Sequence, residues 1–249
     1  MNSFMGLDIG SSATKAALVT DGRVVRVAVR PSMPDMAAAA VLVVADLAAP
    51  GAPVLATGYG RLLYDARIGD VSEVTALAAG VEAVLPGTAT VIDIGGQDSK
   101  AARVSAGRVV DFAMNDRCAA GTGRFLEAMS RVLGVPIDRL DEVASGPGDP
   151  VAITSTCTVF AETEVVGLLA RGTPVTRVLK GLFASIVDRV AGLARQVGVA
   201  APVAATGGAL RSRAIADALS AAVGVRVVVP DSPQVVTAIG AAVLCSRRA

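Results

Sequence analysis

The feature that most constrains the fold of this chain is an internal repeat with a period of 85 residues. Residues 7–25 align without a gap with residues 92–110, and 11 of the 19 aligned positions are identical. Each copy reads as an apolar strand ending in Asp-Ile-Gly, a polar turn, a second strand that begins at a lysine, and a glycine turn before a third strand. The repeat therefore predicts two copies of one supersecondary unit.

Strand and helix patterns alternate around the two copies. Short strands are expected at residues 54–56, 202–205 and 225–229, and a loop at residues 146–150. Helices are expected at residues 36–47, 71–83, 122–133, 159–169, 175–197, 211–223 and 235–244. This alternation predicts an α/β fold.

The composition excludes several kinds of site. The 249 residues include no histidine, so a Ser-His-Asp triad and histidine metal ligands are impossible. The 23 basic and 22 acidic residues are spread along the sequence, so no nucleic-acid partner is expected. Neither a run of about 18 strongly apolar residues nor a cleavable N-terminal signal is present, and we expect a cytoplasmic protein with no membrane contact.

The two Asp-Ile-Gly turns indicate a nucleotide-binding site. A glycine turn lets backbone N–H groups approach phosphate oxygens, and the flanking acid can hold Mg²⁺ directly or through water. A single turn of this kind is usually an ordinary hairpin. Here there are two, with a third glycine turn at Thr206-Gly207-Gly208. No G-x-x-x-x-G-K-[ST] sequence is present, so the chain is not a P-loop enzyme.

Two of the three cysteines lie in polar loops. Cys118 and Cys157 each come immediately before an expected helix, where the helix dipole favours a thiolate or an anionic thiolate-bound cluster. The alternative is that both are small core residues. Cys245 lies near the C-terminal arginines and is assigned no role. A closed iron–sulfur cluster usually takes four thiolates, which two cysteines from each chain of a dimer would supply.

The repeated Asp-x-Gly units and the late Thr-Gly-Gly before a helix resemble the actin, hsp70 and sugar-kinase ATPases. The resemblance implies two RNase H-like domains, residues 1–86 plus 234–249 and residues 87–233, with ATP or ADP and Mg²⁺ in the cleft between them. It implies that Asp8 and Asp93 position the metal and water. The other expected nucleotide-binding residues are Gly10, Ser11, Ser12, Ala13, Thr14, Lys15, Gly95, Gly96, Gln97, Asp98, Gly121, Thr122, Gly123, Gly207 and Gly208.

The cysteine segments narrow the resemblance to one family. Asn-Asp-Arg-Cys-Ala-Ala-Gly-Thr-Gly-Arg-Phe around Cys118 and Ser-Thr-Cys-Thr-Val-Phe-Ala-Glu around Cys157 closely resemble the activators of 2-hydroxyacyl-CoA dehydratases. That family includes the ATP-binding subunits of benzoyl-CoA reductase. The resemblance implies that Cys118 and Cys157 hold one [4Fe–4S] cluster across the axis of a homodimer, or of a pair with a related subunit.

The same resemblance implies an oxygen-sensitive ATPase of anaerobic metabolism. It would accept an electron from ferredoxin or flavodoxin and use ATP to pass it, at low potential, to a dehydratase or reductase partner. The sequence departs from the family pattern where Ala76 and Leu77 replace a frequent Cys-His pair after Glu73. It is also short between residues 29 and 54, and the two departures leave the partner's identity open.

Two other functions are compatible with the motifs. A small-molecule kinase of the same superfamily, similar to pantothenate kinase, would use Asp93 or Asp98 as a general base and would carry no cluster. A non-catalytic scaffold would bind ATP without hydrolysing it. Neither alternative explains the two cysteine segments, so the activase is the preferred prediction.

Overall fold

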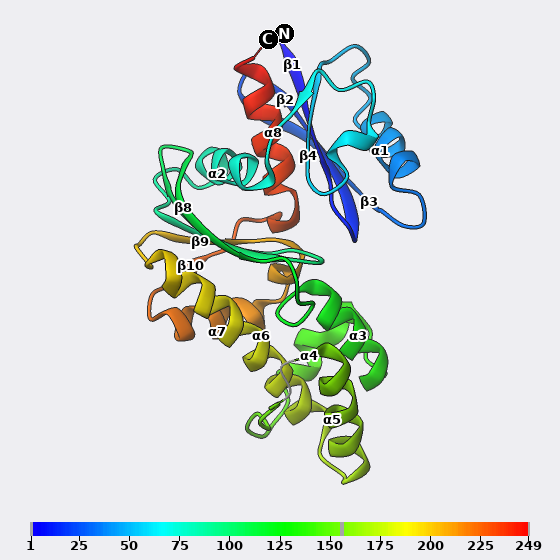
Figure 1. The fold of residues 1–249 in the computed structure, drawn as a ribbon, viewed down its shortest axis with the longest axis vertical. Coiled ribbons are helices and arrows are strands. Elements are labelled where there is room, and N and C mark those ends of the chain that lie inside the picture. The colour runs from blue at the N-terminus through cyan, green and yellow to red at the C-terminus, as the bar shows by residue number, and fades with distance from the viewer. Residues whose placement is uncertain (1, 155–156, 249) are drawn as a thin grey trace.

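The computed structural model describes residues 2–154 and 157–248 and contains two five-stranded sheets of the same topology (Figure 1). Each sheet consists of a three-stranded antiparallel meander followed by two strands parallel to its first strand. The first, in the order β3-β2-β1-β4-β5, comprises β1 (Ser3–Ile9), β2 (Ala13–Thr20), β3 (Arg23–Pro31), β4 (Val54–Thr57) and β5 (Gly69–Asp70). The second, in the order β8-β7-β6-β9-β10, comprises β6 (Thr90–Ile94), β7 (Ser99–Ser105), β8 (Arg108–Asn115), β9 (Val203–Thr206) and β10 (Val227–Val228). The predicted duplication is confirmed.

The duplication extends to irregularities of the sheets. The register between the second and third strands shifts at Leu18/Val19 and at Arg103/Val104, which are equivalent positions of the repeat. The turns that follow have positive φ at both central residues, 49° and 78° at Asp21-Gly22 and 47° and 71° at Ala106-Gly107. Positive φ at both positions is what a two-residue hairpin turn of type I′ requires.

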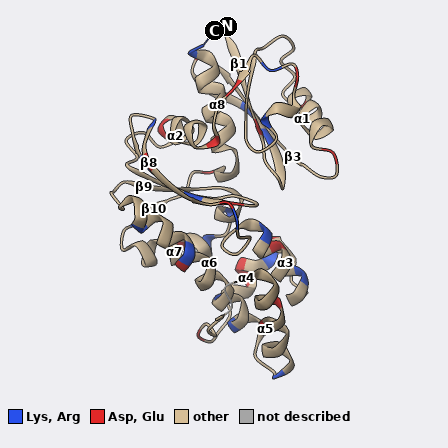
Figure 2. Ribbon diagram, viewed as in Figure 1, with Lys and Arg blue, Asp and Glu red and all other residues tan. Residues whose placement is uncertain are grey.

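The helices lie on both faces of each sheet. They are α1 (Met36–Ala45), α2 (Glu73–Val84), α3 (Gly123–Leu133), α4 (Leu140–Ala144), α5 (Thr158–Ala170), α6 (Val175–Val197), α7 (Arg213–Val223) and α8 (Val236–Ser246). Single 3₁₀ turns are η1 (Arg61–Leu63), η2 (Ile137–Arg139), η3 (Gly208–Arg211) and η4 (Pro233–Val235). No helix in the described ranges is long and apolar enough to cross a membrane. Charged residues are dispersed over both parts of the molecule (Figure 2).

Each sheet is buried between helices. The apolar face of α1 packs on the first sheet, and α6 and α7 pack on the second. The helices α2 and α8 lie between the two sheets, where α8 contacts β1, β2 and β4, and α2 contacts β7 and β8 (Figure 1). α3, α4 and α5 form the end of the molecule that is farthest from the two termini.

The helices α2 and α8 cross in direct backbone contact. A Cβ atom at Gly80 would overlap the carbonyl oxygen of Val236, and one at Gly240 would overlap the carbonyl oxygen of Ala76. Only glycine permits this approach, because any side chain would push the helices apart. The crossing therefore joins the two sheets, since α8 packs on the first and α2 on the second. The division into domains at residues 86 and 234 stays a prediction.

The expected elements are present with modest shifts of their ends. The expected loop at residues 146–150 is confirmed. The expected strand at residues 225–229 contracts to β10, and the helix expected from residue 211 begins at Arg213 after η3. The short elements β5 and α4 were not predicted, because two to five residues carry too little periodicity to be recognised.

Candidate functional site

A cavity of about 730 Å³ lies between the two sheets and is lined by both copies of the repeat. Fourteen of the residues expected to bind nucleotide line it: Asp8, Gly10, Ser11, Ser12, Ala13, Lys15, Asp93, Gly95, Gly96, Gln97, Asp98, Gly123, Gly207 and Gly208. These residues come from the ends of β1, β6 and β9, the turns after them, the first residues of β2 and the first residue of α3. The first glycine turn comes from one sheet and the other two from the second sheet, and all three meet at this cavity.

Three of the expected residues do not line the cavity. The Thr14 hydroxyl lies 2.8 Å from the Ser32 hydroxyl on the neighbouring strand. Thr122 is the N-cap residue of α3, and its hydroxyl donates to the carbonyl oxygen of Ala119 at 2.6 Å. Gly121 has φ of 89°, and its carbonyl oxygen accepts the Ser99 hydroxyl. All three instead shape the turns that carry the lining residues.

The two phosphate-loop candidates meet across the cavity. A Cβ atom at Gly10 would lie 2.8 Å from the carbonyl oxygen of Ala13, so the first turn closes tightly only with glycine. A Cβ atom at Gly96 would overlap the Ser12 side chain of the opposite loop. The absence of a side chain at Gly96 therefore lets the two turns approach each other closely enough to contact one small anion together.

Each copy places an aspartate beside a lysine on the adjacent strand. The β1–β2 register pairs Asp8 with Lys15, and the β6–β7 register pairs Asp93 with Lys100. In the first copy the Lys15 ammonium lies 2.9 Å from Asp8 Oδ2. Burial lowers the pKa of Lys15, but the charge and hydrogen bond of Asp8, together with the charges of Glu73 and Asp93, raise it by more, so the lysine stays cationic.

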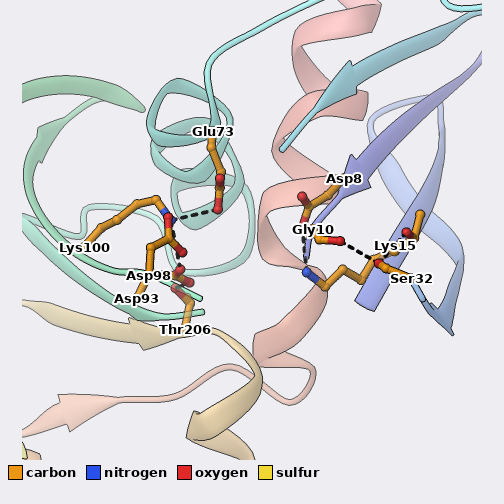
Figure 3. A network of polar contacts seen from close by, with 10 residues as sticks. Asp8, Gly10, Lys15, Ser32, Glu73, Asp93, Asp98, Lys100 and Thr206 are labelled. Atoms are coloured by element: carbon orange, nitrogen blue, oxygen red, sulfur yellow. Dashed lines mark hydrogen bonds and ion pairs between the residues drawn. The ribbon is translucent and has the colours of Figure 1, made fainter. Parts of the chain in front are cut away.

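The second copy surrounds its lysine with three carboxylates (Figure 3). The Lys100 ammonium, only 3% exposed, lies 2.7 Å from Asp98, 2.8 Å from Glu73 and 3.8 Å from Asp93. Burial lowers the pKa of Lys100, but these three charges raise it well above its ordinary value. The difference between the copies arises because Ala13 stands where the second copy has Asp98, and because Glu73 of α2 reaches Lys100.

Asp93 has a different environment from Asp8. The Thr206 hydroxyl donates to Asp93 Oδ1 at 2.7 Å. Burial raises the pKa of Asp93, and the charge of Lys100 and the Thr206 hydrogen bond reduce that shift without cancelling it. Asp93 therefore takes a proton more readily than a carboxyl group in water does.

The donor set of the cavity fits a hydrated divalent cation. Four carboxylates (Asp8, Glu73, Asp93 and Asp98) and two lysines (Lys15 and Lys100) give this wall a formal charge of −4 + 2 = −2 when all are ionised. Asp8 Oδ1 and Ser12 Oγ are buried and have no hydrogen-bond partner among the described residues. Oxygen acceptors beside excess negative charge are what Mg²⁺ and its water ligands prefer.

Two parts of the cavity were missed by sequence reasoning. Glu73 reaches it as the first residue of α2, directly after the N-cap Ser72, and no local signal indicates that this helix start faces Lys100. The other end is lined by apolar side chains together with the polar groups of Asp141, Arg211 and Ser212. The apolar ones are Leu126, Ile137, Leu140, Phe183 and Ile215. A polar half beside an apolar half suits a phosphorylated ligand with an aromatic base.

The two cysteines lie outside the cavity and differ in their local structure. Cys157 is the N-cap residue of α5, as expected, whereas Ser155 and Thr156 of the same motif lie outside the described residues. Cys118 does not directly precede a helix, because α3 begins only at Gly123. Instead Asn115 holds its turn, donating to the carbonyl oxygens of Cys118 (2.9 Å) and Ala120 (3.2 Å) and accepting from the Cys118 N–H (3.2 Å).

The start of α3, which follows the Cys118 turn, is bonded to the second glycine loop. The N–H groups of Gly123 and Arg124, the first two residues of α3, donate to the carbonyl oxygens of Gly95 and Gly96, each at 2.8 Å. The first N–H groups of α3, which have no acceptor within the helix, are therefore bonded to the loop that lines the cavity. A displacement of Gly95 and Gly96 would move the start of α3 with it.

Comparison with known proteins agrees with this geometry. A family model described as the BadF/BadG/BcrA/BcrD ATPase family matches residues 5–245. The crystal structure of (R)-2-hydroxyglutaryl-CoA dehydratase component A from Acidaminococcus fermentans superposes with a TM-score of 0.94 at 35% identity, covering 100% of this chain and 99% of that one. The activator of 2-hydroxyisocaproyl-CoA dehydratase from Clostridium difficile, with bound ADPNP, gives a TM-score of 0.92 at 34% identity, covering 99% and 95%.

A more distant comparison bears on the fold alone. A glucokinase of the ROK family from Streptomyces griseus superposes with a TM-score of 0.62 at 16% identity, covering 98% of this chain and 99% of that one. The predicted fold class, a duplicated α/β fold of the actin and sugar-kinase type, is confirmed.

Proposed function

Because the chain belongs to the BadF/BadG/BcrA/BcrD ATPase family, we propose that it is an ATP-dependent activator of a 2-hydroxyacyl-CoA dehydratase or a benzoyl-CoA reductase-type partner. ATP with Mg²⁺ occupies the cavity between the sheets. The glycine turns at Gly10 and Gly95-Gly96 hold the phosphates, and the apolar half of the cavity holds the base. Gly207 and Gly208 approach the nucleoside from β9.

The carboxylates at the strand ends have distinct tasks in this proposal. Asp8 would hold water of the Mg²⁺ shell through the carboxylate oxygen that faces the cavity. Asp93, whose pKa burial raises, positions the attacking water and accepts its proton. Lys100 keeps its charge throughout and holds Asp98 and Glu73 in place.

Cys118 and Cys157 are proposed to bind a [4Fe–4S] cluster together with the same two residues of a second copy. Within the described part of one chain, no three His, Cys, Asp or Glu side chains are placed to bind a metal directly. The cluster therefore needs the second copy, and the cation in the cavity would be held through its water ligands. Val159 and Phe160, in the first turn of α5 behind Cys157, are 68% and 69% exposed, which favours a protein partner there. The cluster supplies one-electron transfer at low potential, from ferredoxin or flavodoxin to the acceptor component.

The observation that carries the proposal is the pair of hydrogen bonds from Gly123 and Arg124 to the Gly95-Gly96 loop. The loop that would contact phosphate is thereby joined to the helix behind Cys118. A change of nucleotide that shifts the loop biases the position of that helix, as a switch driven by phosphate contacts requires.

Iron analysis tests the cluster directly. After anaerobic purification or reconstitution we expect about two irons and two acid-labile sulfides per chain, since one four-iron cluster would be shared by two chains. Cys118→Ala and Cys157→Ala should each retain less than about a tenth of this iron, because each removes two of the four thiolates of the dimer.

The third cysteine provides the matched control for this test. Cys245 is buried in α8 against the first sheet, with its thiol 3.4 Å from the carbonyl oxygen of Pro53. Cys245→Ala should therefore keep the wild-type iron content. An iron-free wild-type protein that phosphorylates a small molecule would replace the activase proposal with the kinase alternative.

Amide hydrogen exchange tests the link between the cavity and Cys118. Addition of Mg·ADP should slow exchange at Gly123 and Arg124 by about tenfold or more, because ordering of the Gly95-Gly96 loop stabilises the bonds that these amides donate. The middle of α1, which packs on the first sheet and does not line the cavity, serves as the internal reference. Equal changes in both regions would contradict a specific connection.

A further inference from the structure

The two copies of the repeat contain an equivalent Asp–Thr pair in two different states. Parallel register places Asp8 beside Thr57 in the first sheet and Asp93 beside Thr206 in the second. Both threonines are fully buried, and both aspartates are at most 5% exposed. In the second copy the Thr206 hydroxyl donates to Asp93 Oδ1 at 2.7 Å. In the first copy neither Asp8 Oδ1 nor Thr57 Oγ1 has a partner within the described residues.

The missing hydrogen bond lowers the stability of the first copy in the ligand-free protein. A buried polar atom without a hydrogen bond costs about 1–3 kcal/mol. The same two residue types in the same register form the missing bond in the second copy, so the backbone of the first copy does not prevent it. The two copies differ in how closely the aspartate pairs with the lysine on the adjacent strand. Asp8 is the nearest acid to Lys15, at 2.9 Å, whereas Lys100 lies closer to Asp98 and Glu73 than to Asp93.

The Lys15–Asp8 ion pair lies where a phosphate would compete for the lysine. A Cβ atom at Gly10 would be 3.1 Å from the Lys15 ammonium, so the lysine reaches the first glycine turn. An anion bound at that turn attracts Lys15 away from Asp8, and Asp8 is then free to rotate. Its unpartnered Oδ1 and the unpartnered Thr57 hydroxyl are the groups available to form a new bond.

We propose that Thr57 is a positioning residue, whose hydroxyl donates to Asp8 Oδ1 once a metal–nucleotide complex binds, as Thr206 already does to Asp93. The inference rests on the proposed nucleotide function and adds a residue that acts through Asp8. With Oδ1 held by Thr57, Asp8 Oδ2 faces the cavity and accepts a hydrogen bond from water on the cation. Gly58, next in the chain, has no side chain to block this movement, and a Cβ atom there would lie 2.5 Å from Asp8 Oδ1.

Equivalent substitutions in the two copies separate this role from a structural one. Thr57→Val removes a hydroxyl that makes no bond in the ligand-free protein, so its thermal unfolding temperature should equal or exceed that of the wild type. Thr206→Val leaves buried Asp93 Oδ1 without its donor, so its unfolding temperature should fall. The affinity for Mg·ADP, measured by calorimetry, should weaken about tenfold in Thr57→Val, the effect of losing one hydrogen bond to a charged group.

Two further measurements complete the test. Thr57→Ser should restore the wild-type affinity for Mg·ADP, and the affinity for ADP in EDTA should be the same in wild type and Thr57→Val. The inference is overturned if Thr57→Val unfolds as early as Thr206→Val, or if its affinity for Mg·ADP stays within about twofold of the wild type. A wild-type protein that binds no Mg·ADP would instead overturn the proposed nucleotide function, and the inference with it.

Discussion

Gly240→Ala is expected to lower the free energy of unfolding by at least about 3 kcal/mol. The new methyl group would overlap the carbonyl oxygen of Ala76 on α2, and the backbone amide of Gly80 also lies within 3 Å of it. The obstacle is backbone rather than a movable side chain, so the two helices must separate. Because α2 and α8 each pack on a different sheet, their separation disturbs both cores. Urea denaturation followed by circular dichroism measures the loss.

The control for this prediction is a glycine in another helix. Gly192 lies in α6, and a Cβ atom there would meet no atom within 4 Å. Gly192→Ala should raise the free energy of unfolding by about 0.5–1 kcal/mol, because alanine loses less conformational entropy in a helix. If the free energy of unfolding of Gly240→Ala lies within 1 kcal/mol of the wild-type value, the close crossing of α2 and α8 is wrong.

Lys100→Met should have a similarly large effect, and one that depends on pH. The substitution leaves Glu73, Asp93 and Asp98 without their common counter-charge in a largely buried place. Removing one partner of a buried ionic group typically costs about 3–5 kcal/mol. We expect the free energy of unfolding to fall by an amount in that range at neutral pH, measured by urea denaturation.

The pH dependence has a definite sign. Burial already raises the pKa of Asp93 in the folded protein, and without Lys100 that pKa rises further. A carboxyl group whose pKa is higher in the folded state than in the unfolded state stabilises the fold as the pH falls through its folded pKa. The loss caused by Lys100→Met should therefore shrink as the pH is lowered from 8 to 5.

The equivalent lysine of the first copy provides the comparison. Lys15→Met removes the counter-charge of one carboxylate, Asp8, instead of three. Its destabilisation should be smaller and should change less with pH. If Lys15→Met and Lys100→Met lose the same free energy of unfolding and have the same pH profile, Lys100 does not neutralise the three carboxylates as a group.

Much of the local structure could be predicted because its causes lie within a few residues of each other. The 85-residue repeat predicts both meanders, including their hairpin turns, since Asp21-Gly22 and Ala106-Gly107 are the residues that adopt positive φ. Gly134 and Gly224 end α3 and α7 in the left-handed conformation, directly after the expected last residues of these helices, whereas the N-caps Ser72 and Ser212 begin α2 and α7 two residues after the expected starts. The glycine turns could be assigned to one site only through the resemblance to the actin, hsp70 and sugar-kinase ATPases, because the turns come from two different sheets and no local pattern shows that these sheets face each other.

The position of Cys118 shows the limit of that reasoning. Its sequence context suggested the start of a helix, but the side chain of Asn115 stabilises a separate turn before α3. A side chain that competes with helical hydrogen bonds can delay a helix by several residues, and sequence patterns locate helix ends poorly for this reason.

By itself the sequence determined the duplicated α/β plan, the three glycine turns and the identity of the acids, lysines and cysteines around them. Only the tertiary structure decided which of these groups touch. It brought Glu73 to Lys100, joined Gly123 to Gly95, and let Gly80 and Gly240 bring two helices into backbone contact. The physical reason is distance along the chain. Turns and caps depend on neighbouring residues, whereas these contacts join segments that meet only after both sheets and their helices have packed.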